Sequence, residues 1–535
     1  MHRRRFLRQS GAAALLGTFA GCSVGEQPDQ QEGTDTTPGV SGDEQAGEPA
    51  TLQERASIPA GVGDIFDAVL NVQELGADPE GEQPITSLLR EQIADNTLLV
   101  FPEGRYRMGR IDATDVSNFG LVSLQGTQPT LVPTEPAADM GDWFIALRGE
   151  NILVNGFELD FTADGYGGRT QIVTTDGDFW CGNIHVRGQL SDSVDAFGFV
   201  VQHPDGTGTA ERLIARDGGK TNGGATIGIF IGLGHAGKIH INDCEMWHFP
   251  GKGIYGSGPG ERAAGAGGGT IHVNGGLYKN NNPANIRLGG GSTIRNVTFR
   301  NENTLKGESV TWERPLPKRH GVVNARSVRV KGDKNGPVVI ENCDFYHEVG
   351  FGSGVITITP TGSAVVRNCN LRIARGNLPA IHLKPDRTNL QPCVFENVSV
   401  SGEERDVPII RVRERAGVEF RDCSIEAPNT NGFNLTIDSG ISLLNTPIDV
   451  GRKVLQFEEG ELSDFHRIEF HNVDNGTQHE YQFSVTNGGG TQAEEIPENG
   501  HVSGTLKGRQ KSVYEFLGDI SELDAAQSIQ VGIKG

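Results

Sequence analysis

The chain has 535 residues, of which 75 are Gly and 25 are Pro, and only 36% are hydrophobic, so it is too rich in glycine for ordinary helical packing. Its 68 acidic residues outnumber 47 Lys plus Arg and give a formal net charge of −21, which excludes nucleic acid as the main partner. No run of 18 apolar residues occurs, so we expect no membrane-spanning helix in the mature chain.

The N-terminus has the layout of an export signal. The basic residues RRRFLR (3–8) precede an apolar, small-residue stretch that ends Phe19-Ala20-Gly21-Cys22. The paired arginines before Phe-Leu indicate the twin-arginine pathway, and the last four residues resemble a lipobox, in which the Cys is lipidated. We therefore expect residues 1–22 to be a signal peptide, with Cys22 anchoring an extracellular protein to the outer face of the cell membrane.

The next segment, residues 23–57, has the composition of an unfolded linker. It consists mainly of Gln, Glu, Asp, Gly, Thr and Pro, with almost no large apolar residue. Because such a segment cannot bury a core, it is predicted to be a disordered acidic tether. With 34 Arg against 13 Lys, the acidic composition resembles that of proteins from salt-loving archaea, and plain solvation of the surface is the alternative explanation.

A strand repeat occupies residues 58–454. Short alternating apolar strands, usually followed by Asn or Asp, recur at intervals of 23–44 residues, and a second set of strands follows in most repeats. Examples are NIHVRG (183), KIHINDC (238), PVVIENC (337) and AVVRNC (364), with NIRLGG (285) and AIHLKP (380) from the second set. Such repeats are too short for βαβ units, so the pattern predicts an all-β fold, a single-stranded right-handed parallel β-helix of about 12 coils.

The segment LGADPEGEQPITSLLREQIADNTLLVFPEGRYRM (75–108) precedes most of this repeat. Together with the strand pattern, it resembles the pectin-lyase-like β-helix superfamily, in which a Gly-Ala-Asp-Pro loop leads to a helix that caps the open end of the core. The resemblance implies an N-terminal cap helix over 86–94, whose apolar spacing predicts that Leu88, Leu89 and Ile93 face inward. It covers about 58–450 and implies a fold rather than an activity.

The coil pattern stops near residue 454. Alternating strands with Gly and Asn turns occupy 455–535 and favour a small C-terminal antiparallel β-sandwich. We expect this accessory domain to cover the open end of the solenoid, where strand edges are otherwise exposed, or to bind carbohydrate.

Six cysteines lie outside the signal peptide, and Cys343, Cys369 and Cys423 each directly follow a turn Asn or Asp. The same position in successive coils predicts an inward column of buried thiols. No paired Cys or His spacing typical of zinc occurs. Cys343 and Cys369 are the one pair that the repeat brings close enough for a possible disulfide.

Two insertions indicate which face carries the chemistry. The loop GSGPGERAAGAGGG (256–269) and the segment NENTLKGESVTWERPLPKRH (301–320) flank one coil and should border the same face. On that face, strand alternation places Arg287 outward, Tyr255 one coil below, and His382 and Lys384 several coils above. The result is a basic, aromatic and amide-rich strip on an otherwise acidic protein.

Such a strip suits an acidic polysaccharide, because Arg and Lys neutralise uronate carboxylates and aromatic rings stack on sugars. β-Elimination needs a cation to stabilise an enolate-like intermediate, together with a base and an acid. The predicted catalytic groups are Arg287 as the cation or base and His235 or Tyr255 as its acid/base partner. The predicted substrate-binding residues are His203, Asp205, Lys279, Asn281, Trp312, Lys318, His382 and Lys384.

Several alternatives stay open at this point. Each candidate also has a purely structural interpretation. Arg287 is expected to form a surface ion pair, HPDG (203–206) a tight turn, and Asn280–Asn282 a ladder of stacked turn amides. The Asp-Asp and Gly-His-Gly motifs of polygalacturonases are absent, and so are the Trp-x-Asp-His and Arg-x-Pro motifs of many pectate lyases. We predict a polysaccharide lyase acting on a uronate-containing glycan, ahead of a hydrolase or a uronate epimerase.

The alternative from another class is a non-catalytic glycan-binding or adhesion protein of the cell surface. The chain is expected to be a monomer whose membrane contact is confined to the N-terminal lipid. No cofactor is assigned. Calcium, which related lyases use to bridge uronates, is the one metal considered, although no Asp cluster with ligand spacing supports it.

Overall fold

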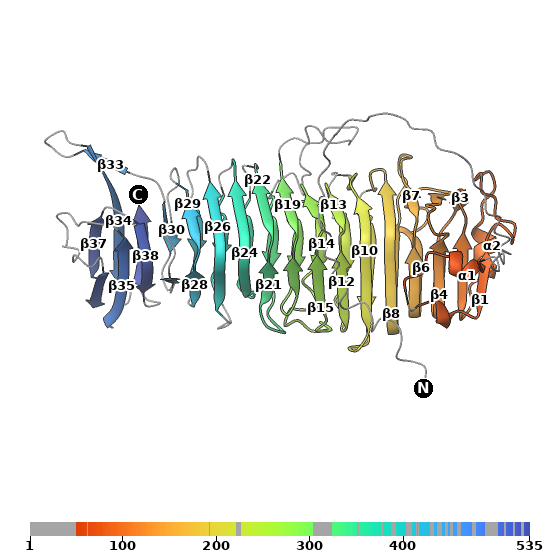
Figure 1. Cartoon of the computed structure of the whole chain (residues 1–535), viewed down its shortest axis with the longest axis horizontal. Coiled ribbons are helices and arrows are strands. Elements are labelled where there is room, and N and C mark those ends of the chain that lie inside the picture. The colour runs from red at the N-terminus through yellow and green to blue at the C-terminus, as the bar shows by residue number, and fades with distance from the viewer. Residues whose placement is uncertain are drawn as a thin grey trace, which may run out of the picture.

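The computed structural model describes most of residues 50–534, which form a long stack of strands between an N-terminal cap and a C-terminal module (Figure 1). The residues left undescribed are 1–49, 61, 192, 221–225, 303–323, 350–351, 376–377, 387–391, 403–408, 414, 416, 428–432, 436–440, 445–447, 450–452, 457–461, 473–477, 487–500, 508–509, 517–518, 526–528 and 535. The predicted signal peptide with Cys22, most of the tether, Trp312 and Lys318 therefore lie outside the described residues. Among the helices in the described part of the chain, none is long and apolar enough to cross a membrane.

Each coil contributes one strand to each of three parallel sheets. Sheet 1 consists of β1 (Ala68–Asn71), β2 (Thr97–Phe101), β12 (Lys238–Asn242), β15 (Thr270–Asn274), β18 (Thr293–Arg295), β21 (Val338–Glu341), β28 (Val418–Arg421), β31 (Ile441–Leu444) and parts of longer strands. Sheet 2 consists of β3 (Arg105–Met108), β5 (Thr130–Pro133), β7 (Glu158–Asp160), β13 (Glu245–Trp247), β16 (Leu277–Lys279), β19 (Thr298–Asn301), β22 (Asp344–His347), β29 (Ser424–Glu426), β32 (Ile448–Asp449) and parts of longer strands.

Sheet 3 consists of β9 (Phe197–Val201), β11 (Ile227–Ile231), β14 (Lys252–Gly256), β17 (Ile286–Leu288), β20 (Val328–Val330), β23 (Ile356–Ile358), β25 (Ile381–Leu383), β27 (Ile410–Val412), β30 (Phe433–Leu435) and parts of longer strands. The longer strands bend through a corner and belong to two or three sheets: β4 (Ile111–Ser123), β6 (Trp143–Asn155), β8 (Arg169–Arg187), β10 (Thr207–Ala215), β24 (Ala364–Ile373) and β26 (Cys393–Gly402).

The predicted parallel β-helix is confirmed. With the sheet 3 parts of β4, β6 and β8, twelve described strands of that sheet span eleven turns, close to the expected 12 coils. Neighbouring coils stack at about 4.8 Å, and parallel crossovers of this kind are almost always right-handed. Alternation directs every second side chain into one continuous core, where Ile254, Ile286 and Val328 are fully buried register partners on successive coils.

The corner between sheets 1 and 2 explains why Asn recurs in the sequence. Asn296, Asn342, Asn368 and Asn397 have φ between 51° and 56°, a left-handed conformation that Asn tolerates better than most residues. Their side-chain amides form a ladder in which each Nδ2 donates to the Oδ1 of the preceding coil, over 3.4, 3.2 and 2.9 Å. Asn280, Asn281 and Asn282 do not belong to this ladder, and their side-chain oxygens instead accept hydrogen bonds from the backbone N–H groups of Glu302, Phe249 and Asn324.

The cysteine that follows the ladder residue points inward, as predicted. Sγ of Cys343 donates to the carbonyl oxygens of Ile294 and Glu341, and Cys369 repeats this arrangement one coil later. All six cysteines of the described chain are buried and free, so the possible Cys343–Cys369 disulfide is not formed. The thiols of Cys244, Cys343, Cys369 and Cys423 fill the core of the corner.

The cap helix α2 (Thr86–Glu91) is shorter than expected, with Leu89 fully buried and Leu88 and Ile93 partly buried against the core. Two further turns precede it, α1 (Leu52–Arg55) and the short helix η1 (Gly63–Ile65). A capping box at Thr51 begins α1, and Ala56 is buried and pairs with Leu124. The chain from Thr51 onward is therefore folded against the first coils, which corrects the predicted end of the tether at residue 57.

The C-terminal strands are β33 (Lys453–Gln456), β34 (Leu462–Asn472), β35 (Gln478–Thr486), β36 (His501–Lys507), β37 (Lys511–Phe516), β38 (Asp519–Ala525) and β39 (Ile529–Lys534). They pair antiparallel in two groups: β34 with β33, β37 and β39, and β35 with β36 and β38. The hydroxyls of Tyr481 on β35 and Tyr514 on β37 lie 2.7 Å apart and join the groups. Because β38 and β39 pair with β31 and β30, this module covers the last solenoid edges.

We predict that Asn368→Ala lowers the free energy of unfolding by about 1–2 kcal/mol, because Ala is strained at this positive φ. It also removes the ladder hydrogen bonds to Asn342 and Asn397. Asn368→Gly is the matched control, since Gly accepts the backbone conformation but lacks the amide. Urea denaturation should rank the variants Ala, Gly and wild type in order of rising stability. A Gly variant as unstable as the Ala variant would contradict the contribution of backbone strain.

Candidate functional site

The outward face of sheet 3 carries a column of basic residues. Register pairs Tyr255 with Arg287, Arg287 with Arg329, Arg329 with Thr357, Thr357 with His382 and His382 with Arg411. Lys331, Lys384 and Arg413 each lie two residues after Arg329, His382 and Arg411, respectively. A second outward column therefore lies beside the first. We call the following residues the basic strip: Arg287, Arg326, Arg329, Lys331, His382, Lys384, Arg411 and Arg413.

The end of the basic strip toward the N-terminus is neutralised internally. Arg287 is only 8% exposed, and its guanidinium lies 4.5 Å from the ring centre of Tyr255. Nη2 of Arg287 is 3.2 Å from Oε1 of Glu261, and Nζ of Lys331 is 2.7 Å from Oε2 of the same carboxylate. Arg287 therefore forms an ion pair, which was the alternative to a catalytic role that the sequence left open.

The other end of the strip has no such compensation. Among the residues that the structure describes, no carboxylate lies within ion-pair distance of Lys384, Arg411 or Arg413. Burial lowers the pKa of Lys384, and the positive charges of Arg326, Arg329 and Arg413 lower it further. Cations that repel one another in this way form a site that an anion stabilises.

Arg326 anchors the strip from beneath. Its Nε donates to Oγ of Ser353 over 2.6 Å, and its Nη1 donates to the carbonyl oxygen of Pro283 over 2.9 Å. Burial, with the charges of Arg329 and Arg287, lowers the pKa of Arg326 to about 9. The side chain is thus held rigidly and still contributes positive potential to the face.

His382 lies within the cation cluster as a neutral ring. Its Nδ1 is hydrogen-bonded to the carbonyl oxygen of Ser353, so Nδ1 carries the proton and Nε2 is an acceptor. Burial lowers the pKa of His382 to about 4, and the charges of Arg411, Lys384 and Arg413 act in the same direction. The ring therefore adds no charge at neutral pH.

His235, predicted as an acid/base partner, occupies a different environment. It is fully buried, Nδ1 accepts from the backbone N–H of Val201 over 3.3 Å, and Nε2 is 3.2 Å from the carbonyl oxygen of Thr270. Both ring nitrogens therefore bond to the backbone, so the prediction is corrected: His235 holds a turn between sheets 3 and 1. His203 and Asp205 also form a turn, in which Nδ1 of His203 accepts from the Asp205 N–H.

Lys279 and Asn281 also serve the fold rather than the face. Lys279 is 1% exposed, and its Nζ lies 3.2 Å from Glu302. Asn281 is fully buried, its Oδ1 accepts from the Phe249 N–H, and its Nδ2 donates to the Met246 carbonyl. Their predicted contact with substrate is therefore corrected, because both side chains are buried and have partners within the protein.

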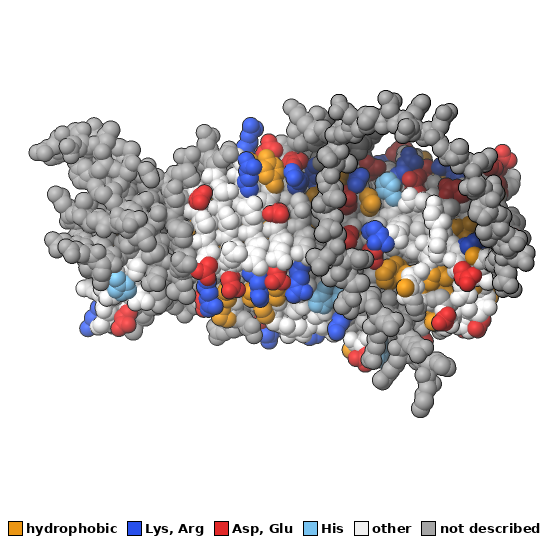
Figure 2. All heavy atoms as spheres, in the orientation of Figure 1, with side chains coloured by type: hydrophobic (Ala, Val, Ile, Leu, Met, Phe, Trp, Pro, Cys, Tyr) orange, Lys and Arg blue, Asp and Glu red, His pale blue; other side chains and the backbone are white. Residues whose placement is uncertain are grey.

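The outward residues of sheets 1 and 2 differ from the basic strip in their charge pairing. Arg295 pairs with Glu341 on the next coil at 2.9 Å, and Arg187 pairs with Glu158 on the preceding one at the same distance. Figure 2 shows acidic and basic side chains interleaved along the solenoid. Outward arginines such as these on sheets 1 and 2 therefore have an acidic partner on a neighbouring coil.

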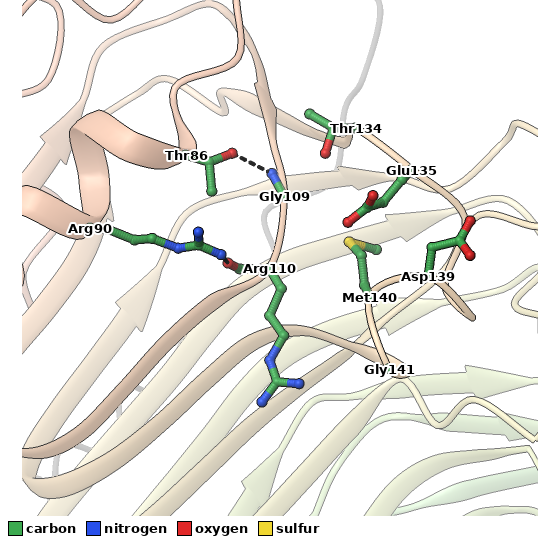
Figure 3. A pocket seen from close by; sticks show the side chains of 9 residues that line it. All are labelled: Thr86, Arg90, Gly109, Arg110, Thr134, Glu135, Asp139, Met140 and Gly141. Atoms are coloured by element: carbon green, nitrogen blue, oxygen red, sulfur yellow. Dashed lines mark hydrogen bonds between the residues drawn. The ribbon is translucent and has the colours of Figure 1, made fainter.

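A separate pocket of about 520 Å³ lies near the cap helix, several coils from the basic strip (Figure 3). Its lining residues are Thr86, Arg90, Gly109, Arg110, Thr134, Glu135, Asp139, Met140 and Gly141. Oγ1 of Thr86 accepts from the Gly109 N–H, and Arg90 donates to the Arg110 carbonyl, both over 2.7 Å. These contacts join the cap helix to the first coils. Among the residues that the structure describes, no group of three His, Cys, Asp or Glu side chains is placed to hold a metal ion.

The fold is a parallel β-helix that carries a basic strip on part of sheet 3. The chain matches no family model and no curated protein. Similar solved structures include the ORF18 protein of Geobacillus virus E2, with 10% identity and a TM-score of 0.40, over 85% of this chain and 76% of that chain.

Two enzymes are also among the similar structures. Pectate lyase Pel9A has 11% identity and a TM-score of 0.32, over 63% of this chain and 77% of that chain. The catalytic unit of the thermostable GH87 alpha-1,3-glucanase from Streptomyces thermodiastaticus strain HF3-3 has 17% identity and a TM-score of 0.28, over 72% and 70%. At these identities and TM-scores, the neighbours assign no residue of this chain a role.

The sequence analysis did not assign five cations of the strip to the site, namely Arg326, Arg329, Lys331, Arg411 and Arg413, and it did not single out Glu261. The signal was present in SVRV (327–330) and IRVR (410–413). In both segments basic residues alternate with inward apolar residues, as Arg287 does in NIRLGG (285). Aligning these segments by their apolar residues recovers the register that the structure shows. No periodic signal marked Glu261, because it lies in a glycine-rich loop.

We predict that acidification from pH 6.5 toward pH 4 destabilises the protein partly through His382. The unfolded ring binds a proton near pH 6.5 and the folded ring only near pH 4, so stability is lost as pH falls, by up to about 2 kcal/mol at pH 5. His382→Gln should flatten this slope in urea denaturations at pH 7 and pH 5. Burial and the neighbouring His240 also lower the pKa of His272 to about 4. His272 should therefore account for the pH dependence of stability that remains in the variant. An unchanged slope in the variant would contradict the assignment.

Proposed function

We propose that the basic strip binds an acidic, uronate-containing polysaccharide and that the protein acts on it at the cell surface. The observation that carries this proposal is the group Lys384, Arg411 and Arg413, which has no acidic partner among the described residues. A chain with a net charge of −21 has acidic side chains in excess with which to neutralise such a group. The cations instead repel one another, and the carboxylates of a bound ligand would relieve this repulsion.

The spacing of the strip supports a linear polyanion as the ligand. Equivalent outward residues stand one coil apart, about 4.8 Å, along the axis of the solenoid. A polysaccharide lying parallel to that axis therefore meets cations at β20, β25 and β27, whereas the outward residue of the intervening β23 is Thr357. Tyr255, half-buried beside Arg287, supplies an aromatic edge at one end of the same column.

For the reaction we propose β-elimination, with Lys384 as the base. Lys384 in its deprotonated form, which burial and the neighbouring cations favour by lowering its pKa, would take the proton from the carbon that bears the uronate carboxylate, while Arg329 and Arg411 stabilise the enolate-like charge. The bond from the neighbouring carbon to the glycosidic oxygen then breaks. The protonated Lys384 or water returns a proton to the leaving oxygen, so one chain ends in an unsaturated uronate and the other in a hydroxyl.

The second candidate is a non-catalytic glycan-binding or adhesion protein, as the sequence already suggested. It is favoured by His235, because the predicted acid/base residue is buried and bonded to the backbone on both sides. Both candidates place the strip outside the cell, and that location rests on the export pattern of residues 1–22. The two differ only in whether the bound glycan is cleaved.

We predict that Arg411→Ala weakens binding of polygalacturonate by on the order of tenfold, because a charge-assisted contact contributes about 1.5–3 kcal/mol. Titration calorimetry of the wild type and the variant at two salt concentrations would measure the loss and a shallower salt dependence. Neutral dextran serves as the control ligand. Equal affinity of the variant and the wild type for polygalacturonate would contradict binding at the strip.

We predict that Lys384→Arg abolishes elimination but preserves binding, since Arg keeps the charge and does not act as the neutral base. Polygalacturonate and alginate are the substrates, and the ultraviolet absorbance of the unsaturated product is the measurement. A variant as active as the wild type would exclude Lys384 as the base. Wild-type binding without product from either polymer would support the adhesion protein instead.

A further inference from the structure

We infer that Glu261 closes the N-terminal end of the basic strip by serving as an internal carboxylate where a glycan carboxylate would otherwise bind. This inference rests on the proposed binding function and assigns a specificity-determining residue to it. The contacts of Glu261 are those expected for a bound uronate. Oε1 accepts from Oγ of Ser257 over 2.8 Å and lies 3.2 Å from Nη2 of Arg287, and Oε2 lies 2.7 Å from Nζ of Lys331.

The loop that carries Glu261 is built into this position. It leaves sheet 3 after β14 and crosses onto the turns of the following coils. A Cβ on Gly260 would lie 2.5 Å from the Gly290 nitrogen, so the two glycine backbones are in direct contact. Arg262 forms a two-contact ion pair with Asp333, at 2.8 and 3.1 Å. Glu261 is therefore presented to the strip by a packed loop.

The carboxylate divides the strip into two parts. Arg287 on β17 and Lys331 just after β20 share Glu261, whereas Lys384, Arg411 and Arg413 further along have no acidic partner in the described chain. A glycan carboxylate near β17 would meet a like charge at the place of the cations it needs. The anionic sugars are therefore received from β20 to β27, and Glu261 limits how far the chain extends toward β14.

The consequence for specificity concerns the length of the ligand. A short oligouronate fits the coils beyond Glu261 and does not contact it. A long polyuronate extends past β20 and is repelled by the carboxylate unless its next sugar is neutral. Neutralising Glu261 frees two cations in line with the strip, so it should favour long polyanions over short ones.

The test compares Glu261→Gln with Glu341→Gln. Glu341 likewise holds two arginines, Arg295 at 2.9 Å and Arg367 at 3.9 Å, but it lies on sheet 1. Both variants therefore change the net charge equally and free two cations each. We expect Glu261→Gln to bind polygalacturonate on the order of tenfold more tightly, with steeper salt dependence, and to bind trigalacturonate as the wild type does. Glu341→Gln should bind both ligands as the wild type does.

Each result has a defined meaning. Wild-type binding with no gain in Glu261→Gln would overturn the inference alone, whereas a wild type that binds no polyuronate would overturn the proposed function. Equal gains in both variants would show a general effect of net charge and also overturn the inference. Adding Lys331→Gln to Glu261→Gln should remove part of the gain, and melting curves would show that the loop variant is folded.

Discussion

The parallel register between neighbouring coils is the constraint on which the structure depends. It turns any position within the coil into a column of side chains about 4.8 Å apart. A residue type that recurs at one position of the coil therefore repeats its favourable or unfavourable interactions from coil to coil. Asn368 in the corner gains a partner on each side, as do the inward isoleucines of sheet 3. The same stacking forces outward cations of sheet 3 onto one another.

Stacked charges of one sign are costly, and the protein stabilises them in two ways. On sheets 1 and 2, arginines alternate with glutamates, as Arg295 does with Glu341. Arg415 is 1% exposed and donates to the carbonyl oxygens of Lys384, Gly362 and Thr359, which satisfies its charge with backbone dipoles. Among the described residues, Arg411 on β27 has neither a glutamate partner nor backbone carbonyl partners of this kind. Like charges at such separations oppose folding by about 1–3 kcal/mol near a surface, so an acidic ligand gains this energy on binding.

The sequence predicted the solenoid because its signals are periodic. Apolar alternation and the left-handed Asn recur in coil after coil, so a single misassigned coil did not alter the fold. The same periodicity placed Tyr255, Arg287, His382 and Lys384 on outward positions of sheet 3, where the structure also has them. Their role in binding remains the proposal tested above.

The predictions that failed concern residues whose surroundings the strand repeat does not determine. His235, Lys279 and Asn281 are in turns or at strand ends, where alternation does not determine side-chain direction, and all three are buried. The long interval before β20 hid the equivalence of Arg329 with Arg287, and Glu261 came from a loop without any repeat. Residues whose positions depend on tertiary contacts of a single loop have no counterpart in a repeating pattern.

The central claim is that sheet 3 receives the carboxylates of a uronate chain. A crystal structure of the protein with a bound oligogalacturonate tests it most directly. We predict sugar carboxylates within ion-pair distance of Arg329, Lys384 and Arg411, with the chain parallel to the solenoid axis and ending before Glu261. An oligosaccharide bound on sheet 1 or sheet 2, or in the pocket beside α2, would contradict the account.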